Sequence, residues 1–260
     1  MIRFFRHLRQ RLMANNKIGK YLLYAFGEIV LVVIGILIAL SINTWNEQRK
    51  EDAQEQVILR RLQQEFIANK TQLENKIEVR STIIKNCQEL LNYFDRPETA
   101  TYEGIIQKLG NMIPTTYDPV ENDLVISGMV EILKNEMLKQ LLVNWSTDVI
   151  QLREVEQIFL NFEEDVLQVY FIENGLMRDT GFSFWQQASA SLLEYQKIEN
   201  PVPKKIRPNA ISKTQILSDS ELEGIITRAL NLNAFNNEES KTLMKRIERI
   251  LELLEEELKN

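Results

Sequence analysis

Few residues of this 260-residue chain combine the types and spacing that catalysis needs. The only histidine, His7, and the only cysteine, Cys87, lie far apart in the sequence. A serine–histidine triad, a thiol with a neighbouring base and a histidine metal site each need several such groups together. Glycine-rich phosphate loops and the G-x-S-x-G turn do not occur. We therefore predict no enzyme, no catalytic residues, no cofactor and no metal site, with an active site assembled from distant residues as the alternative.

One carboxylate has an unusual setting. Glu28 lies within the apolar run from Tyr21 to Ile42. An ionised carboxylate inside a bilayer costs on the order of 3 kcal/mol on insertion scales. Glu28 can carry protons, can hydrogen-bond to a partner helix, or can reach the interface and cost little. We favour association with a partner helix over a proton pathway.

The apolar run itself predicts a transmembrane helix at 21–42, because a span needs ~20 residues. One face of this helix carries Gly27, Leu31, Gly35 and Ala39 at four-residue spacing, and its small residues, beside Glu28, allow another helix to pack there. Trp45 follows as an interfacial anchor. A cleavable signal peptide is the alternative, since Ala39 and Ser41 resemble a cleavage site, but the run is longer than such peptides use.

Charge is distributed unevenly about this run. Residues 1–42 contain six basic residues and a single acidic residue, Glu28. The basic residues are Arg3, Arg6, Arg9, Arg11, Lys17 and Lys20. The positive-inside rule predicts a cytoplasmic N-terminus and an exported C-terminal domain. Residues 1–20 either form an amphipathic helix on membrane lipid or only set topology. The net charge of −6 argues against nucleic acid as a partner.

The sequence blocks around the span resemble a known signature. IRFFRHLRQRL at 2–12 and YLLYAFGEIVLVVIGILIALSINTWNEQRK at 21–50 resemble the N-terminus of an uncharacterised bacterial family of single-span proteins, a domain of unknown function. A weaker resemblance continues in PTTYDPVENDLVISGMVEILKNEMLKQLL at 114–142. The resemblance implies a single-pass protein of the bacterial inner membrane with a helical periplasmic domain, and it implies no activity.

The rest of the chain predicts helices. We expect one long helix over 47–94, with a stripe at Leu59, Leu62, Phe66, Leu73, Ile77, Ile84 and Leu91. Shorter helices are expected at 101–113 and, after a cap at Asn135, at 136–174. Near-heptad spacing marks the core side of the 136–174 helix as Leu138, Leu141, Leu142, Trp145, Val149, Leu152, Val155, Phe159, Phe162, Val166 and Val169. Its opposite face carries Arg153, Glu154, Glu163 and Glu164.

Later segments give less regular signals. A loop and then a helix from about Ser183 carry the aromatic and apolar residues Phe182, Phe184, Trp185, Leu192, Leu193 and Tyr195, which form either core or a ligand pocket. A linker at 200–209 precedes helices at about 218–232 and 238–259. The 136–174 stripe is either a core face of the chain's own bundle, which we favour, or a coiled-coil contact between subunits.

The predicted architecture is all-α, with a basic segment at 1–20, a transmembrane helix at 21–42, and a long helix and exported helical bundle within 43–260. The first functional hypothesis is a membrane-anchored interaction or scaffold protein that associates with another membrane protein or with itself. An accessory subunit of a proton-driven or transport complex using Glu28, and a ligand-sensing ectodomain, are the alternatives.

Overall fold

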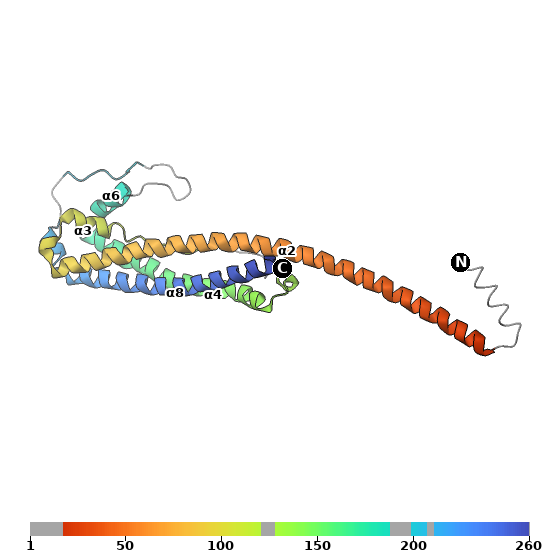
Figure 1. The fold of residues 1–260 in the computed structure, drawn as a ribbon. Helices are drawn as coiled ribbons and strands as arrows, with labels where there is room; N and C mark the ends of the chain where they lie inside the picture. The colour runs from red at the N-terminus through yellow and green to blue at the C-terminus, as the bar shows by residue number, and fades with distance from the viewer. Residues whose placement is uncertain (1–17, 121–127, 188–198, 207–210, 260) are drawn as a thin grey trace. The chain divides into compact units, whose positions relative to one another are not determined.

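A computed structural model describes residues 18–120, 128–187, 199–206 and 211–259 (Figure 1). Within these ranges the regular elements are helices and turns without any strand, so the predicted all-α fold is confirmed. The chain divides into two compact units, Met1–Ile58 and Leu59–Asn260. The boundary falls inside helix α2, Ile18–Asp95, and the two units are described separately.

In the first unit, α2 exposes its apolar side chains. Leu22, Phe26, Leu31 and Ile42 are all at least 60% exposed. Ser41 Oγ donates a hydrogen bond to the Leu37 carbonyl at 2.8 Å, so this polar group is satisfied within the helix. Among the described residues this is the one helix long and apolar enough to cross a membrane. It is compatible with a single-pass membrane protein.

The second unit is a bundle of three long helices. The part of α2 from Leu59 onward lies alongside α4, Glu136–Phe162, and α8, Ser220–Lys259 (Figure 1). On α2 the buried positions repeat in alternating steps of three and four, apart from one step of seven between Leu73 and Arg80. They are Leu59, Leu62, Phe66, Asn69, Leu73, Arg80, Ile83, Cys87 and Leu90. The predicted stripe is right as far as Leu73, but Ile77, Ile84 and Leu91 are only half-buried. Asn69 and Arg80 are polar residues at buried positions, so a search for apolar residues alone does not detect the full repeat.

Shorter helices pack at one end of this bundle. They are α3, Tyr102–Leu109; α5, Gln168–Glu173; α6, Met177–Gln187; and α7, Lys213–Ile216, with the 3₁₀ turns Pro97–Thr99 and Met129–Ile132 between longer elements. Leu109, Phe159, Leu167, Phe171 and Ile226 belong to the core cluster that joins them to α2 and α8. Thr101 caps α3 by accepting a hydrogen bond from the Gly104 amide at 3.0 Å. The predicted α3 and its buried Ile105, Ile106 and Leu109 are confirmed.

The predicted 136–174 helix contains a π turn. It begins as expected after Asn135, whose side chain accepts from the Leu138 amide at 3.0 Å. After Phe162 a π-helical segment, Glu163–Leu167, separates α4 from α5. A π turn adds a residue and rotates the buried face. Val166 and Val169 are therefore exposed, Leu167 and Tyr170 are buried in their place, and Glu163 is buried rather than solvated.

The two helices predicted at the C-terminus form one helix, α8. The asparagine-rich stretch between them predicts an interruption of the helix, because asparagine has low helix propensity. Asn233, Asn236, Asn237 and Ser240 are nevertheless helical and buried. Tertiary hydrogen bonds hold this stretch, for example from Asn237 Nδ2 to the Ile77 carbonyl at 3.3 Å.

Other boundaries also differ from the sequence-based ones. Helix α6 begins at Met177 rather than near Ser183. Helix α7 was not predicted, although Ser212 and Gln215 form a capping box at its start. Residues Met129–Ile132, which lie between the helices expected at 101–113 and 136–174, form a 3₁₀ turn.

Candidate functional site

The membrane-helix residues singled out by sequence lie on the exposed part of α2. A Cβ placed on Gly27 or Gly35 meets nothing within 4 Å, and Glu28 and Ala39 are exposed. This surface is open for another helix, and its use as a packing face stays a prediction. Trp45 is 65% exposed, with the Arg49 guanidinium 5.8 Å from its ring centre.

The basic residues expected on the cytoplasmic side are largely outside the described part of the chain. Arg3, Arg6, Arg9, Arg11 and Lys17 all precede the first described residue, and so does His7. Lys20 lies in the first turn of α2. The contribution of these charges to topology stays a prediction.

A buried polar layer joins the three long helices of the bundle. Arg80 on α2 is 1% exposed, and its Nη1 donates to Glu156 Oε1 on α4. Its Nε donates to Asn237 Oδ1 at 2.9 Å and its Nη2 to Ser240 Oγ at 2.5 Å, both on α8. We call Arg80, Glu156, Asn237 and Ser240 the polar layer.

The polar layer also helps to fix the segment at 117–120. Glu156 Oε2 accepts a hydrogen bond from the Tyr117 amide at 2.7 Å, and Arg153 Nε donates to the Tyr117 carbonyl at 3.2 Å. Asn69 pairs with Val120, accepting from its amide at 2.8 Å and donating to its carbonyl at 3.3 Å. The segment at 117–120 is thus held by α2 and α4 together.

The polar layer is suited to structure rather than to chemistry. Burial lowers the pKa of the Arg80 guanidinium, and the Glu156 carboxylate opposes that shift. Every donor of the guanidinium named above already has a protein acceptor, and no substrate can reach a side chain this buried. The Cys87 thiol is likewise buried in the core, where desolvation raises its pKa to about 12. Within the described residues, no group of three or more acidic, histidine or cysteine side chains is placed to hold a metal ion.

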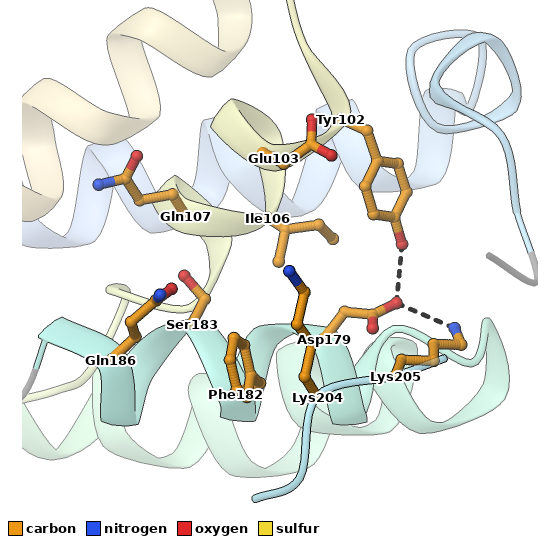
Figure 2. A pocket seen from close by; sticks show the side chains of 10 residues that line it. All are labelled: Tyr102, Glu103, Ile106, Gln107, Asp179, Phe182, Ser183, Gln186, Lys204 and Lys205. Carbon is orange, nitrogen blue, oxygen red and sulfur yellow. Dashed lines mark hydrogen bonds and ion pairs between the residues drawn. The ribbon is translucent and has the colours of Figure 1, made fainter. Parts of the chain in front are cut away.

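A cleft opens between α3, α6 and the linker at 199–206 (Figure 2). Its volume is about 520 Å³, and its walls are Tyr102, Glu103, Ile106, Gln107, Asp179, Phe182, Ser183, Gln186, Lys204 and Lys205. Asp179 Oδ2 accepts hydrogen bonds from the Tyr102 hydroxyl at 2.8 Å and from Lys205 Nζ at 2.9 Å. Burial, followed by the bond to Asp179, raises the pKa of Tyr102. We call this site the α3–α6 cleft.

A second cavity, of about 490 Å³, lies beside the π turn. Its lining is mostly apolar, with Met112, Leu167, Phe171 and Phe184 among its walls. Glu163 is the buried carboxyl at its edge and accepts from Gln168 Nε2. Desolvation raises the pKa of Glu163, which favours its protonated form.

The predicted aromatic cluster is divided between these two cavities. Phe182 lines the α3–α6 cleft, whereas Phe184 lines the cavity beside the π turn. The rings of Phe184 and Trp185 meet edge to face, with centroids 5.2 Å apart. Leu192, Leu193 and Tyr195 lie outside the described residues.

The solvent side of α4 and α5 carries an apolar stripe. Val143, Ile150, Ile158, Val166 and Val169 are between 37% and 55% exposed, and the first four follow steps of seven or eight residues. The predicted heptad stripe, in contrast, is buried in the chain's own bundle from Leu138 to Phe159, except that Leu141 and Val155 are half-buried. We call the exposed stripe, with its flanking acids Glu154, Glu164 and Asp165, the α4–α5 outer face.

Sequence reasoning missed the α4–α5 outer face and Arg80. The outer face was missed because strict helical periodicity assigned Val166 and Val169 to the core. Arg80 was missed because an arginine at a core position reads as a solvated residue. Its signal was present, however, since Leu73, Arg80 and Cys87 keep seven-residue spacing with Leu59 and Phe66.

None of the curated proteins matches this chain, and none of the solved structures does. Residues 28–115 match the model of a family of unknown function (DUF6090), which agrees with the uncharacterised domain indicated by the sequence. This match covers α2 from Glu28 onward, α3 and the segment up to Thr115, and it does not include α4 to α8.

Proposed function

We propose that this chain is a membrane-tethered interaction module that presents the α4–α5 outer face to a helix of another membrane protein. The exposed apolar part of α2 is the tether, and it carries Glu28 and the small residues to a partner span. The protein acts by binding rather than by catalysis, and nucleic acid is not its partner.

The observation that carries this proposal is the composition of the outer face. Single exposed apolar residues are ordinary, but exposed apolar residues repeated every two turns along a helix give the spacing of anchors with which a partner helix packs. Between Glu136 and Glu173 the two basic residues are Lys139 and Arg153, and both are half-buried and paired with acids. The exposed charges of this face are therefore acidic.

This charge pattern selects the partner. An amphipathic helix with an apolar stripe and flanking Lys or Arg would complement the outer face in shape and in charge. A second copy of the same face would place acid against acid. We therefore favour a different membrane protein with a basic amphipathic helix over self-association.

Photo-crosslinking in intact membranes tests this proposal. A photoreactive side chain at Ile150 or Ile158 should give the same crosslinked product, while one at the exposed Thr227 of α8 should give none. Mass spectrometry should map the crosslinked peptide to a basic amphipathic helix. Products of homodimer mass, equal products from Thr227, or no product from Ile150 and Ile158 would each contradict the proposal.

We further propose that the N-terminus is cytoplasmic and the bundle periplasmic in a bacterial inner membrane. The support is the basic excess before the apolar run, which retains that end in the cytoplasm. Alkaline phosphatase fused after Lys259 should be active, and the same fusion to a chain lacking the apolar run should be inactive. The opposite pattern would reverse the assigned orientation.

Glu28 favours a second candidate function, in an energy-transducing complex, because it is a carboxylate exposed on the apolar part of α2. Glu28→Gln keeps the shape and the hydrogen-bonding capacity but cannot ionise. Loss of proton-driven function with the complex still assembled would favour this candidate, and unchanged function would leave Glu28 as a packing residue.

A further inference from the structure

The α3–α6 cleft contains two charged groups that the fold does not neutralise. Asp179 is already satisfied by Tyr102 and Lys205, and the side chains of Asp179 and Lys205 are only 12% and 6% exposed. Glu103 and Lys204 also line the cleft, and neither forms an ion pair with another residue of the described chain. One free anion and one free cation therefore remain for a ligand.

The linker is fixed to α6 in a way that positions Lys204. Arg178 Nε donates to the Pro203 carbonyl at 3.0 Å, and Arg178 Nη2 donates to the Lys204 carbonyl at 3.2 Å. The next residue, Lys205, is held by Asp179. With its backbone held on both sides, Lys204 extends its amine into the cleft beneath Ile106 (Figure 2). These contacts fix the backbone from which the exposed Lys204 side chain projects.

The other walls of the cleft complete a small-molecule site. Ile106 and Phe182 supply apolar surface in its middle, and Gln107, Ser183 and Gln186 lie toward one end (Figure 2). The volume of about 520 Å³ falls in the ordinary range of small-ligand pockets. Such a pocket is far too small for a folded partner.

We propose that the α3–α6 cleft binds a small zwitterion of the α-amino-acid class. Its carboxylate pairs with the Lys204 ammonium and its ammonium pairs with the Glu103 carboxylate. Its side chain lies against Ile106 and Phe182. This site is separate from the α4–α5 outer face, so the proposal does not depend on the function proposed above.

The balance of charge in the cleft argues for a zwitterion over a simple anion. Two lysines and two carboxylates line the cleft, so its net charge is zero. A phosphate or a dicarboxylate would be repelled by Glu103 as it approached Lys204. A zwitterion can pair its carboxylate with Lys204 and its ammonium with Glu103 at the same time, so both side chains gain an oppositely charged partner.

Isothermal titration calorimetry on the full-length protein in detergent tests this proposal. The probes are L-leucine and L-phenylalanine. The analogues are N-acetyl-leucine, which lacks the ammonium, leucinamide, which lacks the carboxylate, and acetate, which lacks the ammonium and the side chain. We expect saturable binding of at least one free amino acid. We also expect at least tenfold weaker binding of both blocked forms and of acetate.

Variants then assign the two charges. Lys204→Ala and Glu103→Gln should each weaken amino-acid binding at least tenfold, which corresponds to about 1.4 kcal/mol. Lys245→Ala and Glu78→Gln, at exposed positions outside the cleft, should leave it unchanged. The thermal midpoint without ligand should be the same for all four variants.

Three results would overturn the proposal. One is the absence of binding by both amino acids at millimolar concentration. Another is binding that survives both Lys204→Ala and Glu103→Gln. The third is acetate binding as tightly as L-leucine, which would make the cleft an anion site.

Discussion

Arg80 and Glu156 form an ion pair between α2 and α4 in which neither side chain is more than 1% exposed. The pair does not stand alone, because Asn237 and Ser240 accept from the same guanidinium and the Tyr117 amide donates to the same carboxylate. A buried pair of this kind contributes little over a well-packed apolar pair. Removing one partner, however, leaves an unpaired charge in the core.

The first prediction concerns this pair. Arg80→Met should lower the free energy of unfolding by about 3–5 kcal/mol, because the Glu156 carboxylate is left buried and unpaired. The double variant Arg80→Met/Glu156→Leu should lose less unfolding free energy than the sum of the losses in the two single variants. Denaturant titration followed by circular dichroism in detergent measures both. Lys241→Ala, which breaks an exposed pair with Glu238, should change stability by less than about 0.5 kcal/mol.

The second prediction uses two glycines. A Cβ on Gly110 would lie 2.7 Å from the backbone oxygen of Thr180, so Gly110→Ala must push the end of α3 away from α6. It should destabilise the protein by about 1–3 kcal/mol. Gly224 lies inside α8 with open space around its Cβ position, so Gly224→Ala should stabilise by about 0.5–1 kcal/mol. Thermal unfolding of both variants checks the contrast, and two changes of the same sign would refute it.

The third prediction concerns pH. Burial raises the pKa of Glu163 in the folded chain above its unfolded value, so the folded state binds the extra proton. Stability should therefore fall as pH rises from the unfolded pKa to the folded pKa of this group, and it should stay lower above that range. Glu163→Gln should remove this part of the decline and stabilise the protein at neutral pH.

The free energy of unfolding, measured at several pH values from about 4 to 8, tests the Glu163 effect. Glu154→Gln on the exposed side of α4 is the matched control and should retain the decline. If Glu163→Gln and the original protein lose stability in parallel as pH rises, Glu163 is not the group responsible.

The fourth prediction concerns Cys87. Its thiol is fully buried with a pKa raised to about 12, so alkylation at neutral pH should require unfolding. Iodoacetamide labelling should be negligible in buffer and complete in denaturant. Arg80→Met should accelerate labelling in buffer, since it increases the unfolded fraction. Rapid labelling of the folded protein would contradict the burial of this side chain.

The sequence predicted much of the fold, and the misses have physical causes. Regular apolar spacing located α3 and the part of α2 within 47–94, and the cap at Asn135 located the start of α4. Two tertiary effects could not be read from periodicity, namely the π turn after Phe162 and the helical asparagines of α8. The α3–α6 cleft was equally hidden, because Glu103 and Lys204 line the same cleft only through the contacts of Arg178 and Asp179 with the linker.

Long helices with leucines at regular intervals can slide past one another. If α8 moved along α2 by seven residues, or ~10.5 Å, most apolar contacts would be replaced by equivalent ones. The guanidinium of Arg80 has matching acceptors on α4 and α8 in one alignment only. A displaced α8 takes the acceptors Asn237 and Ser240 away from the buried guanidinium, and a displaced α4 leaves Arg80 without its counter-ion Glu156, which costs several kcal/mol. The arginine thus selects one alignment of the bundle, while the leucines supply most of its cohesion.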